Sequence, residues 1–257
     1  MTLSDTPITE HFKTPAMATP LRLGVLTPSS NTALEPLTSE IVRALPGASV
    51  HFSRFKVTEI ALGATALGQF DDEKILAAAE LLADARVDVI GWSGTSSGWL
   101  GFEADHRLCE RIQSRTGIRA TTAVLALNEL LAIKGIRRLG LVTPYTADVQ
   151  QKIVEQYGRM GVEVVAQRHL GISENHAFAA VDPGRLVALM EEVADARPEA
   201  LTTFCTNLRA APLAPRIEAS LGIPLLDTVS TTVWGMLRAA GHSPAPITGW
   251  GGLFQWT

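Results

Sequence analysis

A run of glycine and hydroxyl residues, GTSSG, spans Gly94 to Gly98 shortly after the apolar segment VDVI. The run matches G-x-S-x-G, the turn that carries the nucleophile of serine hydrolases. A second run, CTN, places the thiol of Cys205 directly after the apolar segment ALTTF. Hydroxyl and backbone N–H groups stabilise anions and a thiol transfers protons, so both runs are candidates for a catalytic site.

The chain repeats itself. RLGVLTP, which begins at Arg22, returns as RLGLVTP at Arg138. The tetrapeptide ADAR ends an apolar-periodic helix at Arg86 and again at Arg197. A third pair, TGI and LGI, follows in the same order. The ordered matches indicate two copies of one α/β unit.

Within each copy, short β-branched segments alternate with segments of helical period, which predicts β–α–β crossovers and parallel sheets. We expect an α/β protein of two similar lobes, each a short parallel sheet flanked by helices. The expected strands are 22–27, 48–55, 87–93 and 118–122, then 138–143, 162–167, 199–204 and 223–226. The expected units are a flexible tail at 1–20, lobes at 21–134 and 135–229, and a C-terminal helix (231–240) with its tail at 230–257, returning toward the first lobe.

Ligands of open parallel sheets bind beyond the carboxyl ends of the strands. The segments there are TPSSNT, GTSSG, TPYTAD and CTNL. The repeat aligns Gly94 with Cys205, on lobes that face one another. Cys205 is therefore a candidate acid or base, with a small buried hydrophobe as the alternative. Cys109 lies in an expected helix, and we expect it to pack there.

Each polar side chain in these segments has a structural and a functional interpretation. The hydroxyls of Thr95, Ser96 and Ser97 either cap a helix that begins near residue 103 or form an anion cradle beside it. SSNT, after the first strand, has the same two interpretations. Tyr145 either donates to a carboxylate or packs, and Asn175 either binds or lies in a turn. Trp92 and Trp99 are expected to pack, with a pocket wall as the alternative.

Composition excludes several classes of protein. The net charge of −4 gives no basic footprint, so we expect no nucleic-acid partner. No apolar run approaches the roughly 20 residues of a membrane span, so we expect no membrane partner. Two distant cysteines suit a reducing, cytoplasmic environment. The chain has no C-x-x-C, H-E-x-x-H, P-loop or G-x-G-x-x-G motif, so we expect neither metal nor cofactor. Homo-oligomer formation stays open.

A hydrolase triad is formally available in the order Ser96, Asp227 and His242. We do not favour it, because GTSSG is not expected to run straight into a helix and no HGGG-like segment is present.

The chain resembles the aspartate/glutamate racemase superfamily, and within it the branch of maleate isomerases and arylmalonate decarboxylases. The resemblance extends over residues 21–254. It is carried by GVLTPSSNTALE, GWSGTSSGW, TTAVLALNELLAIKGIRRLGLVTPY, LGISEN, the cysteine of TTFCTNL and GWGGLF. It implies two pseudo-symmetric, flavodoxin-like lobes with the active site between them, no cofactor, and a small carboxylate or dicarboxylate substrate.

Racemases and maleate isomerases of this superfamily carry a cysteine on each lobe, whereas this chain has Gly94 at the first position and Cys205 at the second. That pattern is similar to arylmalonate decarboxylase. The resemblance implies a dioxyanion hole formed by Thr95, Ser96, Tyr145 and the backbone of Thr206, beside Gly94. The segments PSSN, with Asn31, and LGISEN, with Asn175, are more similar to those of maleate isomerases. In those enzymes both asparagines contact a substrate carboxylate.

The resemblance and the chemistry favour the same reaction. Loss of CO₂ from a malonate leaves an enediolate, which oriented donors must stabilise. Cys205 then protonates one face of the planar carbon, whereas racemisation needs a group on both faces, and Gly94 supplies none. We expect a cofactor-independent decarboxylase of substituted malonates. The alternatives are a maleate isomerase or amino-acid racemase that uses water or Ser93 as its second group, a non-catalytic carboxylate-binding protein, and a serine hydrolase.

Overall fold

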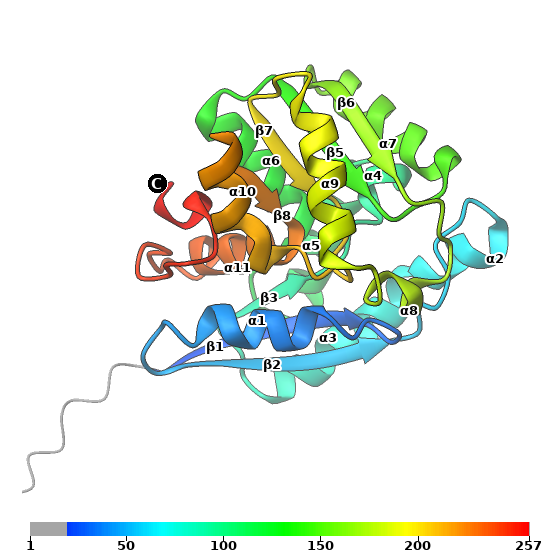
Figure 1. The fold of residues 1–257 in the computed structure, drawn as a ribbon. Helices are drawn as coiled ribbons and strands as arrows, with labels where there is room; N and C mark the ends of the chain where they lie inside the picture. Colours follow the sequence, from blue (N-terminus) through cyan, green and yellow to red (C-terminus); the bar gives the residue numbers. More distant parts are fainter. Residues whose placement is uncertain (1–19, 257) are drawn as a thin grey trace, which may run out of the picture.

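The computed structural model describes residues 20–256 (Figure 1). The flexible tail expected at 1–20 therefore lies, apart from Pro20, outside the described residues. No helix in the described part of the chain is long and apolar enough to cross a membrane.

Two four-stranded parallel sheets form the framework (Figure 1). The first contains β1 (Leu21–Pro28), β2 (Ala48–Phe55), β3 (Val89–Trp92) and β4 (Ala120–Thr122) in the order β2-β1-β3-β4. The second contains β5 (Arg138–Thr143), β6 (Glu163–His169), β7 (Ala200–Thr203) and β8 (Leu225–Asp227) in the order β6-β5-β7-β8. The two sheets share one topology, which agrees with the repeat in the sequence.

Helices connect and flank the strands. The first copy contains α1 (Leu34–Val42), α2 (Ala64–Leu67), η1 (Gly68–Phe70), α3 (Asp72–Asp84), α4 (Ser97–Leu100), α5 (Glu103–Thr116) and α6 (Ala123–Lys134). The second contains α7 (Ala147–Arg159), α8 (Asn175–Phe178), α9 (Pro183–Ala194), η2 (Ala211–Leu213) and α10 (Ala214–Leu221), followed by α11 (Thr228–Ala239) and η3 (Gly252–Gln255).

The repeated segments form equivalent local structures. Both ADAR segments end in an arginine with positive φ, 51° at Arg86 and 53° at Arg197. Each lies just beyond a helix, α3 or α9, and leads into the next strand. The two Gly-Ile pairs likewise place a left-handed glycine at a helix end, Gly117 after α5 and Gly222 after α10. Such positions favour glycine, since it has no Cβ to clash.

The C-terminal helix α11 packs on β3 and β4 of the first sheet and beside α6. The helix begins at Thr228, about one turn before the start expected from the sequence at Thr231. The reason is the Asp227 carboxylate, which accepts hydrogen bonds from the N–H groups of Val229 (2.9 Å) and Ser230 (3.3 Å) and so caps the helix.

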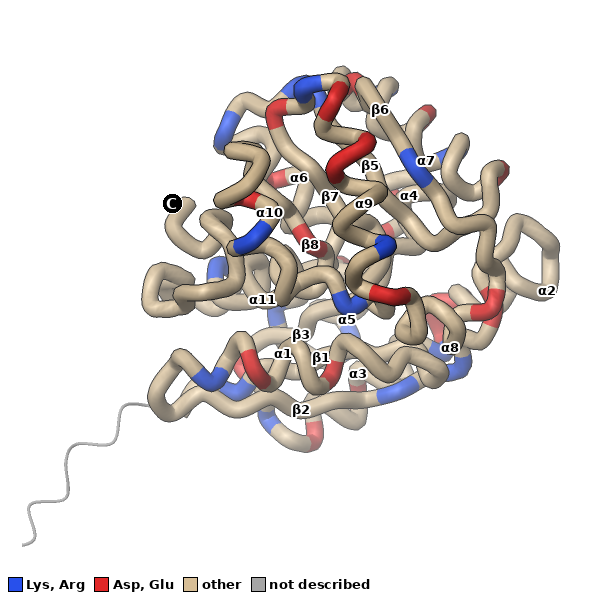
Figure 2. The backbone as a smooth tube through the Cα atoms, viewed as in Figure 1, with Lys and Arg blue, Asp and Glu red and all other residues tan. Residues whose placement is uncertain are grey.

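Charged residues of both signs are interspersed along the chain in Figure 2, without a long stretch of one sign. They pair across the surface, as in the contacts of Arg54 with Glu35 and Arg168 with Glu192. The interior around the ends of β3 and β7 instead holds small polar side chains, among them Ser93, Thr203 and Asp227, all buried. Polar groups kept away from water need partners, so a buried polar cluster of this kind is a candidate functional site.

Candidate active site

One cavity is lined by every residue that the sequence predicts for the site. These residues are Asn31, Gly94, Thr95, Ser96, Tyr145, Asn175, Cys205 and Thr206. They come from the loops after β1, β3, β5 and β7 and from α8, so the ends of both sheets contribute. The remaining lining is apolar apart from two indole N–H groups and consists of Pro28, Val57, Ile60, Phe70, Trp92 and Trp99.

The cavity measures about 20 Å³, which is room for roughly one water molecule. The surrounding loops must therefore separate to admit any ligand larger than a water molecule.

Cys205 follows β7, and its side chain is only 3% exposed. Its Sγ accepts a hydrogen bond from the N–H of Asn207 at 3.4 Å. Burial raises the pKa of the thiol to about 12, and a hydrogen bond from Tyr145 partly opposes that rise. The thiol is therefore protonated at neutral pH, which suits a proton donor better than a nucleophilic thiolate.

Two hydroxyls meet beside this thiol. The Thr95 Oγ1 and Tyr145 OH atoms lie 2.7 Å apart, and both side chains are buried. Burial raises the pKa of Tyr145 well above its ordinary value, so the phenol keeps its proton. One hydrogen bond between the two hydroxyls uses one of their two protons, and the Tyr145 proton that points to Cys205 is the one that a bound anion could accept instead.

The helix-cap interpretation of Asn31 is confirmed. Its Oδ1 accepts hydrogen bonds from the N–H groups of Ala33 and Leu34, each at 3.0 Å, at the start of α1. Its Nδ2 donates to Thr206 Oγ1 at 3.2 Å. That hydroxyl in turn donates to the Ser93 carbonyl at 3.0 Å. The chain of contacts ties the loop after β7 to the loops after β1 and β3.

Asn175 is the first residue of the short helix α8 and not part of a simple turn. Its N–H donates to the Thr58 carbonyl at 3.0 Å, and its Nδ2 donates to Ser30 Oγ at 2.9 Å. Residues 174 and 59 pair in an antiparallel bridge next to it. Asn175 is thus held against loops of the first sheet.

Asn207 is a residue of this region that was not singled out from the sequence. Its Oδ1 accepts from the N–H groups of Thr32 (3.0 Å) and Ala33 (3.2 Å), and its Nδ2 donates to the Asn175 carbonyl at 2.5 Å. One amide therefore joins three loops. Its position two residues after Cys205 is the sequence signal that could have identified it.

The expectation that GTSSG does not run straight into a helix is wrong. Helix α4 begins at Ser97, with Ser96 at its N-cap position, although the Ser96 side chain makes no capping hydrogen bond in the structure. Ser97 also does not cap a helix near residue 103. Its hydroxyl donates to Asp105 Oδ2 at 2.8 Å, and Thr122 donates to the same oxygen at 2.5 Å. The buried carboxyl of Asp105 recruits these hydroxyls and so fixes the loop.

The hydrolase triad does not assemble. Asp227 caps the start of α11, whereas His242 follows its end and contacts the Ala240 carbonyl. A helix of twelve residues separates them, a length of about 18 Å. Ser96 therefore has no Asp–His pair.

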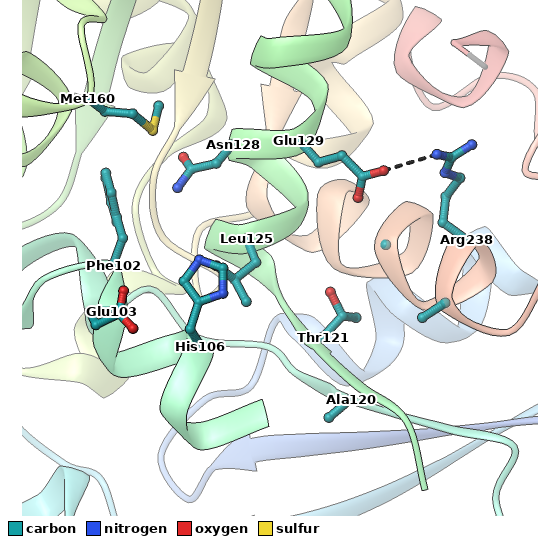
Figure 3. A pocket seen from close by; sticks show the side chains of 12 residues that line it. Phe102, Glu103, His106, Ala120, Thr121, Leu125, Asn128, Glu129, Met160 and Arg238 are labelled. Atoms are coloured by element: carbon teal, nitrogen blue, oxygen red, sulfur yellow. Dashed lines mark hydrogen bonds and ion pairs between the residues drawn. The ribbon is translucent and has the colours of Figure 1, made fainter. Parts of the chain in front are cut away.

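A larger hollow of about 760 Å³ lies elsewhere, between α5, α6 and α11 (Figure 3). Figure 3 shows Asn128 and His106 directed into it, beside the ion pair of Glu129 with Arg238 (3.0 Å). None of the predicted site residues lines it. Within residues 20–256, no cluster of three or more His, Cys, Asp or Glu side chains could hold a metal ion.

The sequence pattern of the arylmalonate decarboxylase family matches residues 44–254. The chain belongs to this family. The relatives of this chain include both arylmalonate decarboxylase and maleate isomerases. The chain is 28% identical to the maleate isomerase of Pseudomonas putida over 249 residues, which cover 91% of this chain and 97% of that protein. It is 28% identical to the arylmalonate decarboxylase of Bordetella bronchiseptica over 186 residues, 71% of this chain and 78% of that protein.

Solved structures agree with the fold. A variant of the maleate isomerase from Pseudomonas putida S16, crystallised with maleate, superposes with a TM-score of 0.85 at 25% identity, covering 93% of this chain and 99% of that one. A liganded variant of arylmalonate decarboxylase superposes with a TM-score of 0.81 at 23% identity, covering 93% and 100%. The maleate isomerase and the arylmalonate decarboxylase thus share the two-sheet architecture of this chain, although they catalyse different reactions.

Proposed function

We propose that the protein is a cofactor-independent decarboxylase of substituted malonates. The observation that carries this proposal is the single, protonated thiol of Cys205 among the residues that line the cavity. Decarboxylation followed by protonation needs one acid. Racemisation needs an acid and a base on opposite faces of the same carbon.

The reaction proceeds in two steps in this proposal. The C–C bond to one carboxylate breaks, CO₂ leaves, and the electron pair passes into the other carboxylate to form an enediolate. The S–H of Cys205 then protonates the carbon, and solvent returns a proton to the thiolate. The enediolate oxygens accept hydrogen bonds from Thr95, Ser96, Tyr145 and the N–H of Thr206, and no metal is needed to hold the charge.

The apolar part of the lining supports the first step. A carboxylate placed against Val57, Ile60 and Phe70 loses its hydration, and a buried charge without partners is costly. Neutral CO₂ bears no such cost. Conversion of a charged group into a neutral one in this environment therefore favours bond cleavage.

Maleate isomerisation is the second candidate, supported by Asn31 and Asn175 in the lining and by the maleate isomerase relatives. A thiol that adds to the double bond serves as nucleophile, so a different group must deliver the proton. Tyr145 is the remaining acidic side chain of the cavity, and its raised pKa makes it a weak acid. The protonated state of Cys205 also disfavours its use as a nucleophile.

A substrate panel separates the two candidates. The purified protein is incubated with α-methyl-α-phenylmalonate, with phenylmalonate and with maleate, and CO₂ release and fumarate formation are measured. We expect CO₂ from the malonates and no fumarate from maleate. Fumarate without CO₂ would establish the isomerase instead. If neither product forms, the protein binds carboxylates without catalysis.

A further inference from the structure

The indole of Trp92 occupies the space that a side chain at Gly94 would need. Trp92 is the last residue of β3, and its side chain is 1% exposed. A Cβ placed on Gly94 would lie 2.0 Å from Trp92 Cζ2 and 2.4 Å from Cε2. Such distances are far inside van der Waals contact. Gly94 is thus required by the tryptophan two residues before it.

The tryptophan has little room to move aside. Phe55 packs against it with ring centroids 5.0 Å apart and an interplanar angle of 47°. Both residues belong to the hydrophobic core. Close-packed interiors do not absorb an inserted side chain without strain, so the position of the indole is fixed by its surroundings.

The same edge of the ring carries an unused donor. Trp92 Nε1 is buried and has no hydrogen-bond partner among the described residues. Nε1 is bonded to Cε2, one of the atoms closest to Gly94, and both Trp92 and Gly94 line the cavity. A buried N–H without a partner is destabilising, and a bound oxygen would relieve that cost.

We propose that Trp92 determines the stereochemical course of the reaction and binds the substrate. The inference rests on the decarboxylase proposed above. The indole closes the cavity from the first sheet, while Cys205 acts from the second, so the carbanionic carbon meets a proton donor on one face only. The indole N–H donates to an oxygen of the substrate or product carboxylate.

A stereochemical experiment tests the closed face. Prochiral α-methyl-α-phenylmalonate is decarboxylated, and the enantiomers of 2-phenylpropionate are separated. We expect one enantiomer from the wild type. Gly94→Cys, whose side chain overlaps the indole, should unfold at a lower urea concentration than the wild type and, where it turns over, still give one enantiomer. In Trp92→Ala/Gly94→Cys both faces carry a thiol. We expect the enantiomeric excess to collapse and the product acid to racemise, as one thiolate removes the α-proton and the other thiol returns one. Racemisation by Gly94→Cys alone, as fast as by the double variant, would overturn the assignment.

A binding experiment tests the donor without requiring turnover. Affinity for 2-phenylpropionate is measured by calorimetry for the wild type, Trp92→Phe and Trp234→Phe. Trp234 is the matched control, because it is also buried and its Nε1 already donates to the Trp256 carbonyl at 3.2 Å. We expect about tenfold weaker binding for Trp92→Phe and no change for Trp234→Phe.

The two experiments separate the two proposals. Binding that Trp92→Phe weakens, in a protein that releases no CO₂ from any malonate, would refute the decarboxylase and keep Trp92 as a ligand-binding residue. Equal affinity in Trp92→Phe and the wild type, or no binding by the wild type, would refute the role of the indole.

Discussion

The Thr95 and Tyr145 hydroxyl oxygens lie 2.7 Å apart, although one follows a strand of the first sheet and the other a strand of the second. The contact links the two sheets at the cavity and places a paired donor beside Cys205. Tyr145 also packs edge-on against Trp99 and Phe178, at centroid distances of 5.3 and 5.5 Å. These rings fix the direction of the phenol. A hydrogen-bond donor that stabilises an oxyanion must be held in place in this way before the reaction begins.

Loss of the Tyr145 hydroxyl should slow decarboxylation. We expect Tyr145→Phe to lower kcat about 10²–10³-fold, the usual cost of one oxyanion donor, with little change in stability. Tyr157→Phe is the matched control, because Tyr157 is the other tyrosine, is buried, and has a hydroxyl without a partner in the described part of the chain. Equal rates for the two variants in a CO₂-release assay would remove Tyr145 from the donor set.

Removal of the Asn207 amide should loosen the contact between loops. In Asn207→Ala, the Thr32 N–H loses its side-chain acceptor and the Asn175 carbonyl loses its donor. We expect the free energy of unfolding in urea to fall by about 2–4 kcal/mol. Asn128→Ala serves as the control, since its Oδ1 has no partner within residues 20–256. A loss no larger than that of the control would contradict the bridging role of Asn207.

Two buried carboxyls should make stability depend on pH. Burial raises the pKa of Asp105 and of Asp227 to about 6, from an ordinary 3.8. A raised pKa in the folded state contributes stability that is complete below about pH 4 and is lost as the pH rises through about 6. Each carboxyl accounts for about 3 kcal/mol of that loss.

Asp105→Asn removes one of these titrations while keeping an oxygen for Ser97 and Thr122. We therefore expect the variant to gain about 3 kcal/mol relative to the wild type between pH 4 and pH 7, from urea unfolding at both values. The exposed Asp84→Asn is the control. A stability difference that does not change with pH would show that Asp105 does not titrate in this window.

The sequence predicted the sheets well because the repeat encodes the same turns twice. The arginines at the ends of both ADAR segments, Arg86 and Arg197, adopt the same left-handed conformation. The site residues that follow the strands also lie together around one cavity, as expected for the carboxyl ends of parallel strands. The start of α11 was missed, since the β-branched run TVSTTV hides a helix that the Asp227 cap initiates.

Other features depended on contacts that no local pattern encodes. Val57, Ile60 and Phe70 reach the cavity from a segment without clear periodicity. The indole of Trp92 fills the space beside Gly94 through a side-chain conformation in which it packs against Phe55. Asn207 gained its three loop contacts only when the two sheets came together.

The rate of CO₂ release by Cys205→Ser, from the malonate that the wild type turns over, tests the central claim most directly. A serine hydroxyl is similar in size but a weaker acid, so we expect kcat to fall at least about 10²-fold while the fold and 2-phenylpropionate binding persist. Cys109→Ser, on α5 and away from the cavity lining, should keep wild-type activity. Full decarboxylase activity in Cys205→Ser would contradict the account.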